Sequence, residues 1–497
     1  MRALIALPVV LPLLAAGVSL ALHRRPAVQR ALSVVVLGAT LVASVALLVT
    51  VERSGVAAVQ VGGWPAPIGI TLVADLFAAI MLVISTAMVL VVLVYAIGHP
   101  RTRDHGLFFH PLYLILATGV AASFLTGDLF NLFVAFEVTL GASYVLITLG
   151  GSRDQVRSGM TYVVISLLAS TLFVTAVGLV YAATGTVNMA DLAGRVAALP
   201  DGVRQALGLL LLVVFGIKAA IFPLFFWLPD SYPTAPAPVT AIFAGLLTKV
   251  GVYAIIRTQT LMFPTDGGPS TLLLAIAGAT MVVGVLGAIA QNDVKRILSF
   301  HIISQIGYMV LGLGLFTVAG LAGGIFYIVH HIVVKTTLFL VGGLVEQATG
   351  TGALSRVGGL LHRTPVVAGL FLLPALSLAG LPPFSGFVAK LALVQGGLAI
   401  GAHTIVGISL AVSLLTLFSM TKIWAGVFWG APEEAPPLAA AAGDGRLSSP
   451  ALMVAPTAVL VVLSLVIAVA AAPLWDLSQR AAATLVDPAP YVEAVLP

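Results

Sequence analysis

Long apolar stretches, each about as long as a membrane-spanning helix, follow one another along almost the whole chain. A transmembrane helix needs about 20 mainly apolar residues. Fourteen stretches are about this long or longer, at residues 3–23, 31–51, 70–97, 107–125, 128–149, 159–184, 205–227, 237–258, 272–290, 298–318, 321–345, 366–400, 403–429 and 451–473. The pattern predicts an all-α polytopic membrane protein with about 14 transmembrane helices.

Two of these stretches contain residues that interrupt a helix. The stretch 366–400 is too long for one straight helix and holds Pro382 and Pro383 near its middle. The stretch 205–227 carries Pro223 and leads into a proline-rich segment. Because proline removes a backbone donor and clashes with the preceding turn, we predict a broken helix in each place.

We expect the chain to fold as an N-terminal segment followed by two repeats. A broken helix in each half of a chain is typical of ion transporters built from repeated halves. We therefore predict two five-helix inverted repeats, each with one discontinuous helix. The predicted divisions are 1–106 for a three-helix N-terminal segment, 107–258 for the first repeat, 272–429 for the second, and 430–497 for a linker, a C-terminal helix and a tail.

Composition narrows the class of protein further. Of the 497 residues, 60% are hydrophobic and only 8% are charged. Soluble domains carry roughly 25% charged residues, so the composition excludes a disordered chain and argues against a soluble domain. The chain has no cysteine, which excludes disulfides, thiolate metal sites and cysteine-bound Fe–S clusters.

Basic residues between the stretches predict the orientation. Twelve Lys and Arg residues fall in the loops of one side, and six fall in the segments of the other. Cytoplasmic loops carry an excess of Lys and Arg, so the side with twelve is expected to be cytoplasmic. Both termini are then expected outside, in a bacterial or archaeal plasma membrane. The net charge of +5 is then cytoplasmic-face charge and does not indicate nucleic-acid binding. The stretch 3–23 has features of a signal peptide. Its apolar residues, however, continue to Leu22 before His23 and Arg24 end the stretch, so we interpret it as an uncleaved first helix.

Five of the six lysines lie inside apolar stretches, and this placement points to ion transport. They are Lys218, Lys249, Lys335, Lys390 and Lys422. An ionisable group at the bilayer centre costs roughly 2.5–3.5 kcal/mol, so such residues usually serve a function. Arginine stays charged, whereas a desolvated lysine can release and recapture a proton. The lysines therefore predict a hydrated or paired proton path.

A glutamate and a histidine complete the predicted path. Glu137 lies near the midpoint of 128–149, and Lys335 lies near the midpoint of 321–345. His331 precedes Lys335 by four residues and so shares its helix face. The predicted proton relay consists of Glu137, Lys218, Lys249, His331, Lys335 and Lys390, with helix breaks at Pro223, Pro382 and Pro383. A buried structural salt bridge is the alternative for the charged members.

Other ionisable residues have simpler interpretations. Lys422 lies seven residues from the end of its span and can extend its side chain to the interface, so a role in transport stays open. His330 is either a packing residue or a member of the path. Interfacial, helix-end or loop positions are expected for Asp75, Asp128, Asp230 and His301.

Several motifs resemble one family along essentially the whole chain. The sequence GDLFNLF at 127–133, followed by Phe136 and Glu137, resembles the glutamate helix of the family shared by Mrp-type cation/proton antiporters and respiratory complex I. The segment from Lys218 to LTKVG at 247–251 resembles that family, as does the second broken helix LAGLPPFSGF at 378–387. The sequence DSYPTAPAPV at 230–239 is most similar to the D subunits of the Mrp branch.

The resemblance implies a role for each relay residue. Glu137 would pair with Lys218 across neighbouring helices, and Lys249 would be the next relay. His331 and Lys335 would form the central connection, and Lys390 the gate at the far end. Water around both helix breaks would complete the path, and proton movement would involve no covalent chemistry.

The resemblance also implies a function within a larger assembly. We expect a proton-translocating subunit of a multisubunit Na⁺/H⁺ antiporter, a secondary transporter and not an enzyme. The alternative is a proton-pumping membrane subunit of a redox complex, either an NADH–quinone oxidoreductase or a membrane-bound hydrogenase. A third possibility, a structural scaffold without ion traffic, conflicts with the intramembrane lysines.

Partners follow from the same resemblance. Expected partners are the other subunits of the antiporter complex, H⁺ and Na⁺ (or K⁺ or Li⁺), and membrane lipid, with no nucleic acid. No cofactor is expected, and no cation site can be assigned from acidic residues. The alanine-rich stretch 435–445 is interpreted as a cytoplasmic linker.

Overall fold

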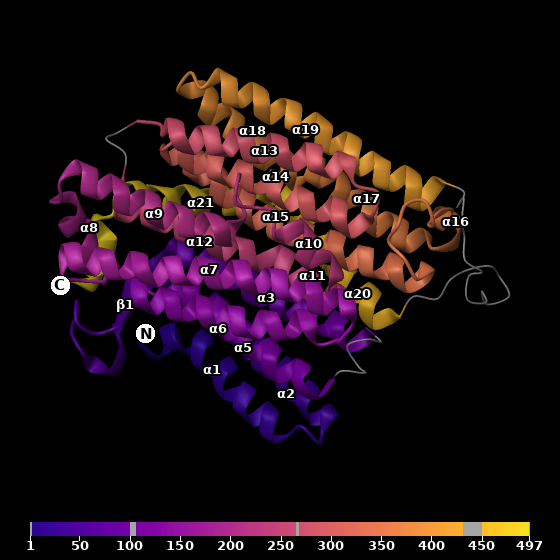
Figure 1. Ribbon diagram of the computed structural model, residues 1–497, viewed down its shortest axis with the longest axis horizontal. Helices are drawn as coiled ribbons and strands as arrows, with labels where there is room; N and C mark the ends of the chain where they lie inside the picture. Colours follow the sequence, from indigo (N-terminus) through magenta and orange to yellow (C-terminus); the bar gives the residue numbers. More distant parts are fainter. Residues whose placement is uncertain (1, 100–105, 265–267, 431–449, 497) are drawn as a thin grey trace.

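The computed structural model describes residues 2–99, 106–264, 268–430 and 450–496, so the alanine-rich stretch 435–445 lies outside the described residues. Most of the described residues are helical, and the long helices run along the horizontal axis of Figure 1. Thirteen helices in these ranges are long and apolar enough to cross a membrane. The predicted all-α membrane fold is confirmed, whereas the exact number of crossings and the two repeats stay predictions.

The apolar helices, of which all but α17 and α18 are long enough to cross a membrane, coincide with the predicted apolar stretches. In the first half they are α1 (Arg2–Ala21), α2 (Pro26–Ser54), α3 (Leu76–Gly98), α5 (Gly106–Leu125), α6 (Leu129–Thr148), α7 (Arg153–Thr184), α9 (Asp201–Ala219) and α11–η3–α12 (Ala237–Leu261). In the second half they are α13 (Thr271–Ala290), α14 (Val294–Gly314), α15 (Val318–Thr349), α17 (Pro365–Ala379), α18 (Ser385–Ala399), α19–η4 (His403–Trp429) and α20 (Ala451–Val469).

Both predicted helix breaks are present. Helix α9 ends at Ala219, and turns lead to the short helices α10 (Leu228–Ser231) and η2 (Tyr232–Thr234). Helices α17 and α18 are each too short to cross alone and are separated by residues 380–384. These breaks coincide with the prolines because a proline ring cannot continue the helical hydrogen-bond ladder.

Several short elements lie outside the predicted pattern. The strand β2 (Thr71–Ala74) occupies the beginning of the predicted stretch 70–97 and forms an antiparallel hairpin with β1 (Ala57–Gln60), which precedes that stretch. The predicted tail after residue 473 is also helical, with α21 (Ala471–Val486) and α22 (Ala489–Val495). The remaining short helices are η1 (Val61–Gly63), α8 (Met189–Ala197) and α16 (Leu360–Arg363).

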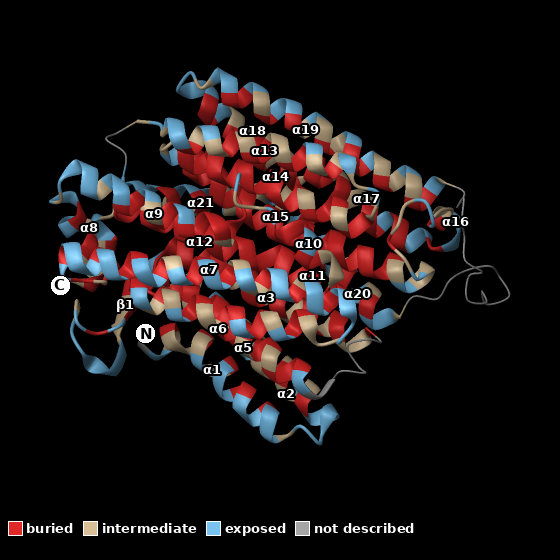
Figure 2. Ribbon diagram, viewed as in Figure 1, coloured by how far each residue is buried: buried red, intermediate tan, exposed pale blue. Residues whose placement is uncertain are grey.

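Helix α15 lies at the centre of the molecule. It packs against α14, α17, α18, α20 and α21, and most of its length is buried. Figure 2 shows buried residues concentrated around α12 and α15, with exposed residues along the outer helices such as α1, α2 and α19. Much of that exposed surface is apolar, with Val35, Val42 and Leu414 among the most exposed side chains. Such faces suit lipid or neighbouring subunits.

The two ends of the chain lie on the same side. Figure 1 places the N- and C-termini at the left end of the helices, together with the hairpin and α8. The opposite end carries the helix junctions with most of the loop arginines, including Arg153, Arg296 and Arg363. We call this opposite end the basic face. Termini on one side agree with an even number of crossings.

Candidate functional site: a chain of buried lysines

The first helix break is held by side chains from elsewhere in the fold. Ala220 adopts a left-handed conformation with φ 60°, which ends α9. The indole nitrogen of Trp227 then donates to the carbonyl of Ile217 at 3.0 Å. The backbone N–H of Phe222 donates to the hydroxyl of Thr280 at 3.0 Å. These bonds satisfy backbone groups that an interrupted helix leaves open inside a membrane.

Lys218 lies one residue before this break and connects to Glu137 through a serine. Its ammonium donates to the carbonyl of Ser166 at 3.3 Å and to the hydroxyl of Ser170 at 3.2 Å. Ser170 in turn donates to the carboxylate of Glu137. A cavity of about 30 Å³ adjoins Lys218 and Tyr162, enough for one water molecule.

Glu137 and Lys218 are thus linked through Ser170 and not by direct contact, and their predicted pairing in the path stays a prediction. Within the described ranges the two side chains form no ion pair within 4.0 Å. Helix α7 packs against both α6 and α9, so its Ser170 lies between the two charges. A hydroxyl both donates and accepts, so this bridge can still pass a proton.

Replacing Ser170 by alanine tests this bridge. The variant removes the hydroxyl but keeps both charges, and it is expected to slow cation-driven proton movement by about tenfold. A hydrogen bond to a charged group is worth roughly 1.5–3 kcal/mol, and about 1.4 kcal/mol corresponds to tenfold in rate. The measurement is the initial rate of ΔpH collapse in vesicles. Ser166→Ala is the matched control, because Ser166 accepts from Lys218 through its backbone carbonyl and not through its hydroxyl. Equal rates in the two variants would contradict the bridge.

Lys249 is fully buried beside a distortion of its own helix. The π-turn η3 (Phe243–Leu247) precedes it, and its ammonium donates to the carbonyl of Ala244 and, at 3.2 Å, to the hydroxyl of Thr248. A π-turn shifts the hydrogen-bond register and often occurs at functional sites. Gly251 brings this helix against the end of α9, since a Cβ there would lie 2.6 Å from the Ala219 nitrogen.

Helix α15 supplies the central part of the predicted relay. His331 and Lys335 are both fully buried. The Lys335 ammonium donates to the carbonyl of Leu298 on α14 at 3.0 Å. Neither ring nitrogen of His331 has a hydrogen-bond partner in the described part of the chain. A buried imidazole without fixed partners can take up or pass on a proton.

His330 links this helix to the second break. One ring nitrogen forms a hydrogen bond of 2.8 Å with the hydroxyl of Ser385, the first residue of α18. Ser385 also lies 3.2 Å from the hydroxyl of Ser377 near the end of α17. His330 therefore joins α15 to the second break through Ser385, and its membership of the path stays a prediction.

Lys390 is part of the second break itself. It extends from α18 back to the end of α17, where its ammonium donates to the carbonyls of Leu378 at 3.0 Å and Ala379 at 3.1 Å. It also donates to the hydroxyl of Ser413 at 2.9 Å. The last carbonyls of a helix lack helical partners and carry negative partial charge, which explains why a lysine is stable here.

His301 was expected at the interface, and this prediction is wrong. It is fully buried in α14, where one ring nitrogen forms a hydrogen bond of 2.9 Å with the hydroxyl of Ser419. The helix that contains His301 begins earlier than predicted, because Asp293 caps α14 and the helix starts at Val294. His301 therefore lies two turns inside the helix.

Lys422 has a structural partner. Its ammonium donates to the carbonyls of Ile289 at 2.9 Å and Gln291 at 2.7 Å, at the end of α13. This is the favourable place for a cation at a helix C-terminus. The contacts support the interfacial interpretation of Lys422.

Asp75 and Arg257 form a buried ion pair that the sequence did not reveal. Their side chains approach to 2.6 Å and are almost inaccessible to solvent. Asp75 also caps α3, and Arg257 donates to the hydroxyl of Tyr253 at 3.2 Å. Asp75 lies at a helix end, as expected, but its carboxylate is buried against Arg257. The signal in the sequence was that these two oppositely charged residues both fall within predicted apolar stretches.

The remaining acidic residues match their expected roles. Asp128 caps α6 by accepting a hydrogen bond from the backbone of Asn131. Asp230 is exposed and pairs with Arg296 at 3.2 Å. A further ion pair joins Lys295 and Glu346. It could not be predicted from the sequence, because Lys295 falls in a loop between two apolar stretches.

Comparison with known proteins agrees with this arrangement. Residues 126–416 match the family described as NADH:quinone oxidoreductase/Mrp antiporter, TM. The chain is 45% identical to the D subunit of the Na(+)/H(+) antiporter of Alkalihalophilus pseudofirmus, over 100% of both proteins.

Two solved structures are similar in fold. A chain in the Mrp complex of Dietzia sp. DQ12-45-1b superposes with a TM-score of 0.92 and is 37% identical, over 100% of both chains. A chain of an archaeal membrane-bound sulfane sulfur reductase superposes with a TM-score of 0.89 and is 27% identical, again over 100% of both. The chain therefore belongs to the NADH:quinone oxidoreductase/Mrp antiporter family, and within it to the group of Mrp D subunits.

Proposed function

We propose that this chain is the proton-translocating subunit of a multisubunit Na⁺/H⁺ antiporter. The observation that carries the proposal is the series of buried lysines. Lys218, Lys249 and Lys390 lie at a helix break or distortion and are hydrogen-bonded to carbonyls or hydroxyls there. Lys335 lies in the unbroken central helix and donates to a carbonyl of α14. Identity to antiporter D subunits, at 45%, exceeds that to the sulfur reductase chain, at 27%, and so favours antiport over redox pumping. The similar Mrp complex supports other antiporter subunits as partners.

The proton path in this proposal begins at Glu137. A proton moves between Glu137 and Lys218 through the hydroxyl of Ser170. The next carrier is Lys249, whose helix packs against α9. Leu247 and Val250, on either side of Lys249, line the small cavity beside Lys218. Water in this cavity would connect the two amines.

The path continues through the second half of the molecule. Lys249 and Lys335 lie on elements that pack against each other: η3 contacts α15, and Gly245, one turn before Lys249, lies against Thr336, the neighbour of Lys335. A proton arriving at one amine therefore favours departure from the other, which couples the steps. His330 and Ser385 connect this centre to the break that Lys390 holds.

The orientation belongs to the same proposal. The chain is a multi-pass membrane protein. We place its basic face in the cytoplasm because cytoplasmic loops carry the excess of Lys and Arg. Both termini are then outside.

Cation-driven collapse of a pH gradient tests the proposal. Everted vesicles from antiporter-deficient cells, carrying the whole complex, would be energised by respiration and then given Na⁺. The wild type should respond, and Lys218→Ala should reduce the initial rate roughly 100-fold. Without the Lys218 amine, a proton in transit would be an unstabilised charge at this depth, which costs about 2.5–3.5 kcal/mol.

Two results of this experiment would contradict different parts of the proposal. A wild-type complex without any Na⁺, K⁺ or Li⁺ response would overturn the antiporter assignment and favour the redox alternative. A normal response in assembled Lys218→Ala would remove Lys218 from the path and leave it a structural role through its hydrogen bonds to Ser166 and Ser170.

A further inference from the structure

A polar cavity opens at the basic face, beside the central helix. Its volume is about 270 Å³, enough for several water molecules. Helices α14 and α15, the segment before α11 and the loop after α15 surround it. Its lining includes Thr234, Ala235, Lys295, Glu346, Thr351 and Gly352. None of the predicted relay residues lines it.

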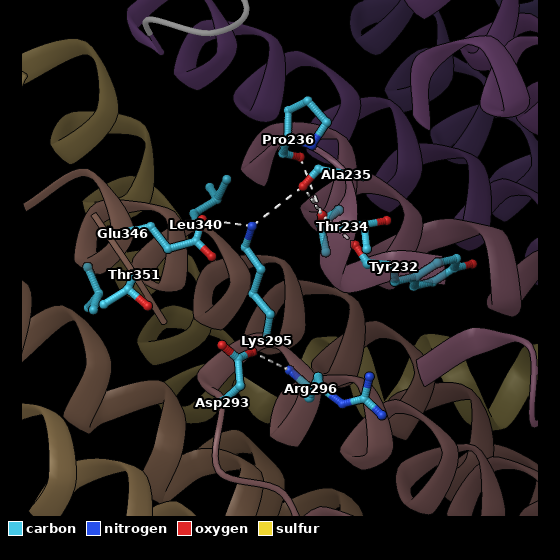
Figure 3. Close-up of polar contacts among 12 residues, drawn as sticks. Tyr232, Thr234, Ala235, Pro236, Asp293, Lys295, Arg296, Leu340, Glu346 and Thr351 are labelled. Atoms are coloured by element: carbon cyan, nitrogen blue, oxygen red, sulfur yellow. Dashed lines mark hydrogen bonds and ion pairs between the residues drawn. The ribbon is translucent and has the colours of Figure 1, made fainter. Parts of the chain in front are cut away.

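An ion pair crosses this cavity. Figure 3 shows the Lys295 side chain extending between Glu346 and Ala235. The Lys295 nitrogen lies 2.7 Å from a Glu346 oxygen and 3.5 Å from the Ala235 carbonyl. The Lys295 side chain is 6% exposed, whereas that of Glu346 is 27% exposed. The carboxylate therefore contacts water, and the ammonium lies on the protein side.

Both charges occupy the unfavourable end of their own helix. Lys295 is the second residue of α14, where the helix dipole is positive, and Glu346 is in the last turn of α15, where it is negative. Neither helix stabilises its own charge, so the pair depends on mutual attraction. Neutralising Glu346 with a proton would remove the attraction and also relieve the repulsion at the end of α15. The stability of the pair therefore depends on the charge of Glu346.

Lys335 contacts α14 about one helical turn beyond the cavity residue Lys295. The Lys335 ammonium donates to the carbonyl of Leu298, three residues and about 4.5 Å further along α14 from Lys295. On the other side, Tyr95 donates to the carbonyl of Leu340 at 2.9 Å, between Lys335 and Glu346 on α15. Polar groups therefore continue from the cavity along both helices to the relay.

We propose that this cavity is the port through which protons pass between water at the basic face and Lys335, with Lys295 and Glu346 as its gate. The inference rests on the proposed antiporter function and adds the place where protons leave or join the path. Toward water, the Lys295 ammonium gives its proton to the Glu346 carboxylate, which releases it. The neutral Lys295 amine then receives a proton from the Lys335 ammonium through intervening water.

The groups facing Glu346 are Lys295 on α14, Tyr95 and His99 at the end of α3, and Asp293 at the start of α14.

Access to the port can be measured without any transport. The chain has no cysteine, so Thr351→Cys places a single thiol at the cavity. A membrane-impermeant maleimide should label it in the assembled complex from the basic face only, which comparison of everted and right-side-out vesicles reveals. Ser299→Cys, fully buried one turn beyond Lys295, is the control and should stay unlabelled. Failure to label Thr351→Cys would overturn the port.

The gate is tested by removing its carboxylate charge. Glu346→Gln should slow Na⁺-driven ΔpH collapse by about tenfold or more. Asp230→Asn removes a carboxylate from an ion pair on the same face but outside the cavity, and should stay within about twofold of wild type. Assembled Glu346→Gln with wild-type rates would overturn the gate. A wild type without cation response would instead overturn the antiporter function, and labelling of Thr351→Cys would still decide whether the port exists.

Discussion

Lys249→Met is expected to abolish Na⁺-driven proton movement, with the initial rate falling roughly 100-fold or more. Methionine has a similar length but cannot carry a proton, and Lys249 lies between the two halves of the path. A proton crossing without this carrier would meet an added barrier of at least about 2.7 kcal/mol, which corresponds to that loss in rate. The measurement is ΔpH collapse in vesicles, corrected for the amount of assembled complex.

Two variants make this result interpretable. Lys422→Met is the same substitution at a lysine that holds the end of α13, and it should retain most of the wild-type rate per complex. Lys249→Arg keeps the charge but cannot release a proton, so it should be as inactive as methionine if the complex assembles. An active arginine variant would show that Lys249 acts only through its charge.

Arg257→Met is expected to cause the largest loss of stability. It leaves the carboxylate of Asp75 buried without its partner, and removing one member of a buried ion pair costs roughly 3–5 kcal/mol. The rings of Tyr253 and Tyr491 around the guanidinium would also lose a contact. Less complex should assemble in the membrane, and after detergent extraction it should dissociate at a lower temperature.

The double variant Asp75→Asn with Arg257→Met separates stability from transport. Asparagine can still cap α3, and no uncompensated charge remains. Assembly should largely recover, and transport per complex should be near wild type because neither residue belongs to the proposed path. A double variant as unstable as Arg257→Met would mean that the ring contacts, and not the ion pair, hold this end of the molecule.

Sequence alone determined the all-α membrane fold and the positions of the helix breaks, and it supplied the candidate residues of the proposed path. Apolar length is a local property, so the spans could be located without knowing how they pack. The breaks at Pro223, Pro382 and Pro383 were equally local, because proline disrupts a helix wherever it stands. Lysines inside apolar stretches were conspicuous because their cost depends on depth in the membrane and not on particular neighbours.

Tertiary structure decided which side chains meet. Ser170, between Glu137 and Lys218, carries no signal in its own helix, and its importance arises only because α7 packs between α6 and α9. Lys295 and Glu346 look like ordinary helix-end charges until α14 and α15 bring them together around a cavity. Contacts between residues this far apart in the chain depend on how helices pack, and periodicity and composition do not encode that packing residue by residue.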